Sequence, residues 1–174
     1  DFWDAENGGF FHPARGGEVL VRSKESYDSA IPSANSVAML NLIRLARLTG
    51  RTELETRAME IGLIFSSQIG QAPTAYTGML NAVQFGLGPA HEIVIAGDPE
   101  SDDTKAMLAA LRGEYLPHAV VLIRAPGDRT LDKRAPYTKE MKMLDGKATA
   151  YICREYACSA PTNDVQRMLE LLRS

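Results

Sequence analysis

The chain is short of cysteine, of long apolar runs and of basic charge, and each shortage excludes a class of protein. Its two cysteines, Cys153 and Cys158, are too few for a disulfide-dense scaffold and, without a second pair of ligands, for a structural zinc site. No apolar run approaches the roughly 20 residues of a membrane-spanning helix, so no membrane association is expected. The cysteine usage and the lack of a signal peptide favour a reducing, cytoplasmic setting.

Acidic residues slightly outnumber basic ones, 22 against 19, for a formal net charge of −3. Non-specific binding of nucleic acid needs a basic surface, so no nucleic-acid partner is expected. The three histidines, His12, His91 and His118, lack the paired spacing of metal ligands. The loop over residues 97–103 carries four acidic residues and no phosphate-binding glycine motif. The sequence therefore predicts neither a metal nor a cofactor.

What the sequence does contain is a change of pattern at Gly88 and Pro89, which predicts two domains, residues 1–88 and residues 89–174. The first is helical after a leader, in which two strand-like runs around a Pro/Gly-rich connection predict a β-hairpin over residues 9–22. The second alternates short apolar runs with helical stretches, which predicts a β-α-β module with a mostly parallel sheet. The expected fold class is therefore α/β.

Helix signals divide the first domain further. A helix is predicted from the N-cap Ser33 to Thr49, with Gly50 in the left-handed position that ends many helices. The next helix opens with the capping-box pattern Thr52–Glu55, and its buried face comprises Leu54, Ala58, Ile61 and Phe65. The short link predicts that these two helices form an antiparallel hairpin. A third helix is predicted over residues 73–85.

In the second domain, apolar runs predict strands over residues 92–96, 119–123 and 148–153. A helix is expected over residues 101–112, between the first two strands, and an amphipathic helix over residues 163–172 closes the chain. Residues 124–147 show no clear period and are predicted to be a loop.

Two segments carry a family resemblance: Asp28–Ser36 (DSAIPSANS) and Ala150–Pro161 (AYICREYACSAP). They resemble hallmarks of the YyaL-type, or spermatogenesis-associated protein 20-like, thioredoxin-domain family. Residues 8–11, 21–24 and 92–97 resemble the same family in the same order, so the resemblance covers nearly the whole chain.

The resemblance implies a much longer parent protein. In this family a thioredoxin-like domain with a Cys-x-x-Cys pair precedes a helical (α/α) toroid of the six-hairpin glycosidase and sugar-epimerase type. The present chain resembles the C-terminal part alone and has no Cys-x-x-Cys pair of its own. Residues 1–88 are then expected to be a fragment of the toroid, and the expected partners are the remainder of the parent chain and a carbohydrate-like small molecule.

Loops at the helix ends of such a toroid line a central cleft, where carboxylates, amides and arginines bind sugars. Asp28 is the candidate general acid or base, and the candidate substrate-binding residues are Arg22, Lys24, Ser33, Asn35 and Ser36. Glycoside hydrolysis normally needs two facing carboxylates, and only Asp28 is persuasive here. Hydrolase or isomerase activity is therefore expected only in the full-length parent. The alternative is that these residues cap and brace the turn before the helix.

The two cysteines flank the sequence Arg-Glu-Tyr-Ala and allow two interpretations. Cys153 and Cys158 could form a redox-active disulfide, and the nearby start of the last helix would lower the pKa of Cys158. Alternatively, both are small buried thiols that fill gaps in the core. The first interpretation supports a second functional hypothesis, in which the chain is a non-catalytic interaction or scaffold module that serves the thioredoxin-like domain of the parent.

Overall fold

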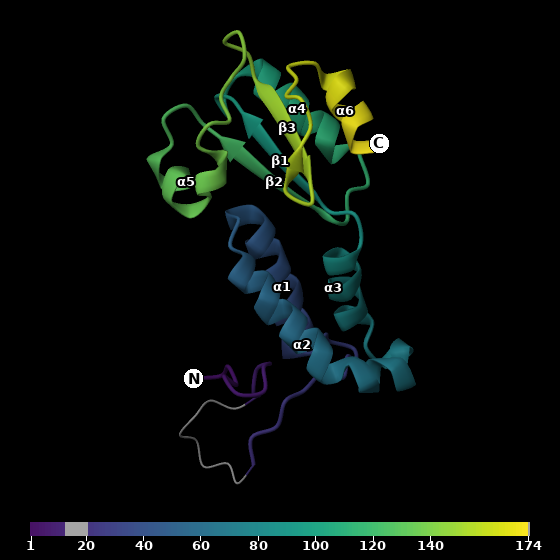
Figure 1. The fold of residues 1–174 in the computed structure, drawn as a ribbon. Coiled ribbons are helices and arrows are strands. Elements are labelled where there is room, and N and C mark those ends of the chain that lie inside the picture. The colour runs from purple at the N-terminus through teal and green to yellow at the C-terminus, as the bar shows by residue number, and fades with distance from the viewer. Residues whose placement is uncertain (13–20, 174) are drawn as a thin grey trace. The chain divides into compact units, whose positions relative to one another are not determined.

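The computed structural model describes residues 1–12 and 21–173 and divides the chain into two compact units (Figure 1). Unit 1 comprises Asp1–Ala46 and Arg51–Gly88, and unit 2 comprises Arg47–Gly50 and Pro89–Ser174. The last turn of the first helix is thus part of unit 2. Within the described ranges, no helix is both long enough and apolar enough to cross a membrane.

The helices of unit 1 are α2 (Thr52–Gln71), α3 (Thr77–Leu87) and, as far as Ala46, α1 (Ala34–Thr49). The predicted limits of α1 are confirmed, because Ser33 directly precedes it and Gly50 directly follows it with a φ of +73°. This left-handed conformation suits glycine, which has no Cβ atom to clash with the backbone. The third helix begins at Thr77 rather than at the predicted Pro73, which instead opens a short 3₁₀ turn.

The capping box predicted for α2 does not form. Arg51 is the N-cap residue, without a side-chain hydrogen bond to the helix, and Thr52 is already helical. The buried face of α2 is confirmed at Ala58, Ile61 and Phe65, whereas Leu54, the fourth residue of the predicted face, is only half-buried. Apolar periodicity therefore predicted which face is buried, whereas the capping-box pattern placed the start of the helix one residue too late.

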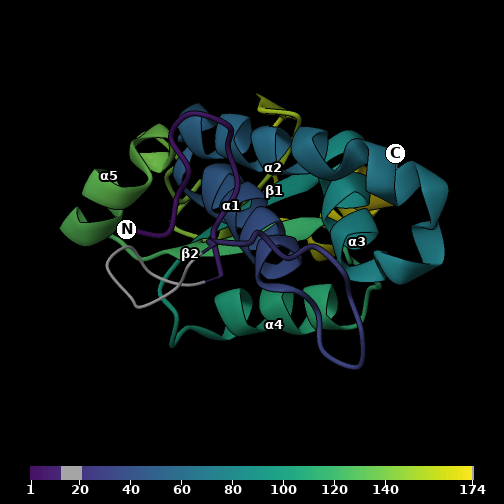
Figure 2. The same ribbon diagram turned by 90° about the horizontal axis from the view of Figure 1, so that it is seen from below.

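Glycines let the helices of unit 1 approach closely. A Cβ atom at Gly62 of α2 would lie 3.1 Å from Met39 Cε, and one at Gly86 of α3 would lie 3.4 Å from Ile43 Cδ1 of α1. Met39 and Gly62 lie about equally far along the chain from the α1–α2 link, so the predicted antiparallel hairpin is confirmed. Figure 2 shows α1, α2 and α3 as neighbours.

The β-hairpin predicted over residues 9–22 is described only in part. Phe10 makes an isolated antiparallel bridge with Trp3, and the two rings meet edge to face with centroids 5.0 Å apart. The His12 N–H donates to Ser23 O at 2.8 Å. Residues 18–20, in the second predicted strand, lie outside the described residues. The described residues therefore do not test the hairpin, which stays a prediction.

The strands of unit 2 form one mixed sheet in the order β2–β1–β3–β4. They are β1 (His91–Ala96), β2 (Ala119–Arg124), β3 (Thr149–Arg154) and β4 (Ala157–Cys158). The parallel pair β1 and β2 is confirmed, with α4 (Asp102–Arg112) in the crossover between them.

The prediction of a mostly parallel sheet is wrong, because β3 runs antiparallel to β1 and β4 runs antiparallel to β3. The chain leaves β2 at Arg124, which pairs with Ala96 at the end of β1. It re-enters the sheet at Thr149, which also pairs with Ala96. β2 therefore ends, and β3 begins, beside the C-terminal end of β1. Because β3 starts at that end, it must run antiparallel to β1 and β2.

The helices α4 and α6 (Val165–Arg173) cover one face of this sheet. The core there contains Ile93, Ile95, Met107, Leu111, Ala148, Ala150, Ile152, Met168 and Leu172. Strand residues alternate between faces, so Glu92, Val94 and Cys153 lie on the opposite face of the sheet.

Two local predictions for unit 2 need correction. The predicted loop over residues 124–147 contains a helix, α5 (Arg129–Arg134), whose N-cap Asp128 accepts hydrogen bonds from the Thr130 and Leu131 N–H groups. Six residues are too few to show a helical period. The closing helix starts at Val165 rather than at residue 163.

Candidate functional site

The structure gives Asp28 two backbone partners. Its Oδ1 accepts from the Ser33 N–H at 2.7 Å, and its Oδ2 accepts from the Met79 N–H in the first turn of α3 at 3.1 Å. Burial raises the pKa of Asp28, but hydrogen bonds from Ser33, Ser36, Met79 and Gly78 outweigh burial and lower it below 3.8. The carboxylate is buried and holds together the chain entering α1 and the chain entering α3.

Asn35 is fully buried and braces the leader. Its Oδ1 accepts from the Phe10 N–H at 2.7 Å, and its Nδ2 donates to Phe10 O at 2.9 Å and Glu25 O at 2.8 Å. Ser33 Oγ accepts from the Ser36 N–H at 3.2 Å, as an N-cap side chain does, and lies 2.8 Å from Ser36 Oγ. These amide and hydroxyl groups bind the protein's own backbone and one another.

The two candidate cations also bind within the leader. Lys24 Nζ lies 2.7 Å from Asp4 Oδ2 and donates to Gly8 O. Arg22 Nη2 donates to Asp1 O at 2.8 Å, and its guanidinium lies 3.9 Å from the centroid of the Phe11 ring. The six candidate residues therefore share one end of unit 1, where each has a partner within the protein. An apolar groove of about 470 Å3 in unit 1 is lined by other residues of α1, α2 and α3.

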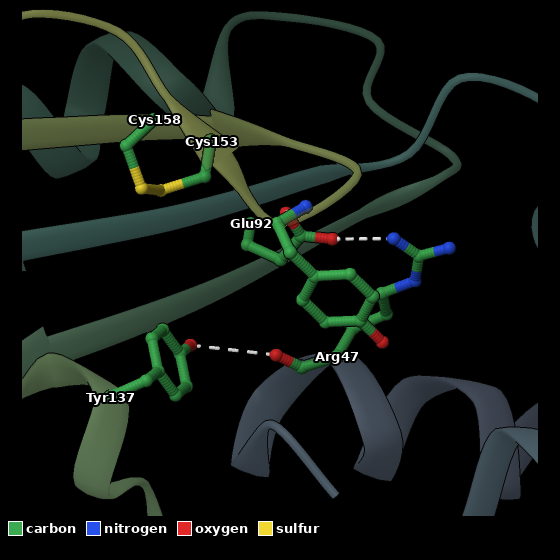
Figure 3. The surroundings of a disulfide bond; sticks show 6 residues. Arg47, Glu92, Tyr137, Cys153 and Cys158 are labelled. Carbon is green, nitrogen blue, oxygen red and sulfur yellow. Dashed lines mark hydrogen bonds and ion pairs between the residues drawn. A yellow bond between two sulfur atoms is a disulfide. The ribbon is translucent and has the colours of Figure 1, made fainter. Parts of the chain in front are cut away.

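A different constellation surrounds the two cysteines, which form a disulfide (Figure 3). Cys153 of β3 and Cys158 of β4 lie directly opposite each other, with their Cα atoms 3.8 Å apart. The next pair along is hydrogen-bonded, with the Ser159 N–H donating to Ile152 O at 2.9 Å. The cysteines thus occupy a non-hydrogen-bonded pair, the type in which opposite Cα atoms approach most closely.

The two cysteines differ in their exposure to solvent. Cys153 is only 2% exposed, whereas Cys158 is exposed on the edge strand. The interpretation of both cysteines as buried gap-filling thiols is therefore wrong. Cys158 lies in β4, seven residues before the first residue of α6, and as a disulfide sulfur it does not titrate. Cys158 is therefore the more exposed residue of the disulfide-bonded pair.

The turn between the cysteines is strained. Glu155 and Tyr156 have φ values of 49° and 66°, so the two-residue loop adopts the type I′ form. This form normally uses Asn-Gly or Gly-Gly, because a Cβ atom disfavours positive φ. Two consecutive non-glycine residues in this conformation need support from their surroundings.

That support comes from a buried ion pair. Glu92 of β1 is opposite Cys153 in the sheet register, so their side chains share a face. Glu92 Oε1 lies 2.9 Å from Arg47 Nη1, and Oε2 accepts from the Tyr156 N–H at 3.3 Å. The Arg47 guanidinium also lies 4.6 Å from the centroid of the Tyr156 ring. The Glu92 and Arg47 side chains are only 2% and 6% exposed.

Tyr137 completes this cluster from the 3₁₀ turn Pro136–Thr138. Its hydroxyl donates to Arg47 O at 3.4 Å (Figure 3). Burial, with a smaller contribution from the negative charge of Glu92, raises the pKa of Tyr137 to about 12. The phenol therefore stays protonated at neutral pH and remains a hydrogen-bond donor.

Sequence reasoning identified both cysteines but missed their neighbours. Glu92 is a carboxylate in an otherwise apolar strand, and buried carboxylates are almost always paired, so this position could have been flagged. Arg47 lies 45 residues earlier, and nothing local connects the two. Tyr156 lies inside the segment quoted for the family resemblance, but a positive φ at tyrosine has no sequence signature.

Comparisons with known proteins show that this chain is similar to one part of much longer proteins. It is 35% identical over 175 aligned positions to "Spermatogenesis-associated protein 20" of Homo sapiens and to the protein of that name from Rattus norvegicus. An uncharacterised protein of Caenorhabditis elegans is 28% identical over 171 positions. The alignments cover 98% of this chain but only 22% of the length of the two mammalian proteins and 23% of the nematode protein. No protein-family model matches the chain.

Proposed function

Because this chain belongs to the spermatogenesis-associated protein 20-like family, we propose that it is a redox-responsive interaction module of a longer protein. In this proposal, the Cys153–Cys158 disulfide exchanges with the Cys-x-x-Cys pair of the thioredoxin-like domain that the family resemblance implies. The observation that carries the proposal is the disulfide between an exposed Cys158 and a buried Cys153. In this proposal the sulfur of the exposed residue is attacked, and the sulfur of the buried residue is the leaving group.

The exchange is a two-electron step. A thiolate of the thioredoxin-like domain attacks Cys158 Sγ, the S–S bond breaks, and Cys153 leaves as a thiolate that takes up a proton. The second thiol of the domain then attacks the mixed disulfide and loses its proton, which releases Cys158 as a thiol. The domain ends with its own cysteines oxidised to a disulfide, and this chain ends with two thiols.

A purely structural purpose for the disulfide is less well supported. The two cysteines are only five residues apart, so the closed loop is short. The loop-entropy relation assigns such a cross-link about 2 kcal/mol, against about 3 kcal/mol for a 15-residue loop. In reducing compartments, disulfides are usually transient and are catalytic or redox-sensing.

The test uses the full-length parent, with the second cysteine of its Cys-x-x-Cys pair changed to serine so that a mixed disulfide cannot resolve. The expected product is an internal cross-link between the remaining cysteine of that pair and Cys158, identified by peptide mapping under non-reducing conditions. Cys158→Ser should abolish this cross-link. A cross-link that maps to Cys153, or none at all, would overturn the proposal.

The apolar groove of unit 1 supports a further proposal, that α1, α2 and α3 are a wedge of an (α/α) toroid in the parent. Met59 and Leu63 of α2 and Leu87 of α3 line the groove and are 61%, 68% and 83% exposed. A helix from the remainder of the parent would bury these side chains, as helix-in-groove packing does.

The carbohydrate cleft stays a prediction. The buried Asp28 carboxylate accepts hydrogen bonds from backbone N–H groups on both oxygens, which favours the bracing alternative. The Asp28 substitution described in the Discussion distinguishes the two roles.

A further inference from the structure

We propose that Glu92 is a positioning residue for thiol–disulfide exchange at Cys153 and Cys158, because it holds the turn between them in the conformation that brings the two sulfurs together. This inference rests on the proposed redox function. It identifies a residue that controls the equilibrium between the Cys153–Cys158 disulfide and the two free thiols. Glu92 reaches the turn through Tyr156: its Oε2 accepts the Tyr156 N–H at 3.3 Å.

The turn cannot supply this closed conformation from its own residues. Glu155 and Tyr156 both disfavour positive φ, so once the S–S bond is broken their intrinsic preference is to open the hairpin tip. An open tip separates the two thiols and lowers their effective concentration, which disfavours the disulfide. Whatever holds the tip closed therefore raises the equilibrium constant for disulfide formation.

Glu92 is placed to do this because it is itself immobilised. The Arg47 guanidinium pairs with Glu92 Oε1 at 2.9 Å, and both side chains are buried. The same guanidinium lies against the Tyr156 ring, with 4.6 Å from its central carbon to the ring centroid. The ion pair thus presents a fixed acceptor to the backbone of the turn and a cation to its aromatic side chain, and each contact favours the closed tip.

The experiment measures the equilibrium constant of the disulfide in this chain against reduced and oxidised glutathione. Glu92→Ala should lower the constant about tenfold, which corresponds to about 30 mV for a two-electron couple. Glu92→Gln keeps an acceptor oxygen and should recover part of that loss. A residue that only stabilises the fold would lower the free energy of unfolding without moving this constant.

A second pair of variants isolates the turn. The double variant Glu155→Asn, Tyr156→Gly supplies the residues that a type I′ turn prefers, and this gain should outweigh the lost contact between Arg47 and the Tyr156 ring, so the constant should rise several-fold. In that background, Glu92→Ala should change the constant less than twofold, because the turn then adopts its closed conformation without the hydrogen bond to Glu92. An equal tenfold effect of Glu92→Ala in both backgrounds would overturn the inference.

The two proposals fail separately. The Asn-Gly variant leaves the Glu92–Arg47 pair intact, so it tests the turn even if Glu92→Ala does not fold. An unchanged constant in that variant would also overturn the inference. If the constant responds as expected but no cross-link to Cys158 forms in the full-length parent, the partner assignment falls and the role of Glu92 stands.

Discussion

Asp28 binds the first turn of α3 and the residue before α1 with a single carboxylate. Each contact satisfies a backbone N–H that would otherwise lack a partner at a helix end, and each adds a favourable interaction with the positive end of a helix dipole. We therefore expect Asp28→Ala to lower the free energy of unfolding by about 2 kcal/mol, as the loss of a strong N-cap does. Urea denaturation at pH 7 measures this change.

The same substitution separates bracing from sugar chemistry. If Asp28 were a sugar-binding or catalytic residue alone, Asp28→Ala in the full-length parent would abolish sugar-induced thermal stabilisation and leave the stability of the unliganded protein unchanged. Asn at position 28 is the matched control, because it keeps an acceptor oxygen and loses the charge.

The pH dependence of stability gives an independent check. The folded pKa of Asp28 lies below its ordinary value of 3.8, so the unfolded chain takes up the proton first as pH falls. The contribution of the carboxylate is therefore complete above about pH 3.8 and is lost as pH drops through the lower, folded pKa. Asp28→Asn should lack this acid-dependent loss, which denaturation series between pH 5 and pH 2 would show.

At the scale of secondary-structure elements, two interactions hold the β3–β4 hairpin: the Cys153–Cys158 disulfide and the buried Glu92–Arg47 ion pair. We expect the ion pair to contribute more to stability than the disulfide. Changing both Cys153 and Cys158 to serine should lower the free energy of unfolding by about 2 kcal/mol, because the loop they close is short. Glu92→Ala should cost more, about 3 kcal/mol, since it leaves the Arg47 charge buried without its partner. Chemical denaturation of both variants, compared with the oxidised wild type, tests the ranking.

Prediction of the elements succeeded where the signal was local. The buried face of α2, the last residues of α1 and the parallel pair β1 and β2 follow from periodicity, a glycine and the length of a crossover. Prediction failed for the direction of β3, because the direction depends on the end of the strands at which the chain re-enters the sheet. It also failed for α5, whose six residues are too few for a pattern.

At the scale of the whole molecule, the groove of unit 1 exposes apolar side chains of α2 and α3. Leu63→Gln should change the stability of this chain by less than about 0.5 kcal/mol, because the side chain is 68% exposed. In the full-length parent, the same change should lower the melting temperature if a helix covers the groove. Ile31→Gln is the control, since Ile31 is 77% exposed and lies outside the groove. Equal effects of the two substitutions on the parent would count against a covered groove.

The candidate site was predictable only in part. Cys153 and Cys158 attract attention because they are the two cysteines of the chain. Asp28, Ser33 and Asn35 were found as polar residues of a turn, and the bracing interpretation came from the usual behaviour of those residue types. The ion pair behind the disulfide joins positions 45 residues apart, and no spacing rule covers that distance.

The sequence alone determined the α/β class, the ends of α1, the buried face of α2 and the apolar strands, because these depend on interactions within a few residues. Tertiary structure decided the reversal of β3, the exposure of one cysteine and burial of the other, and the contact of Glu92 with Arg47 and Tyr156. The physical reason is burial. The properties of the Glu92 carboxylate, of the cysteines and of the strained turn depend on the groups that pack around them and exclude water. Those groups come from segments that are distant in the sequence.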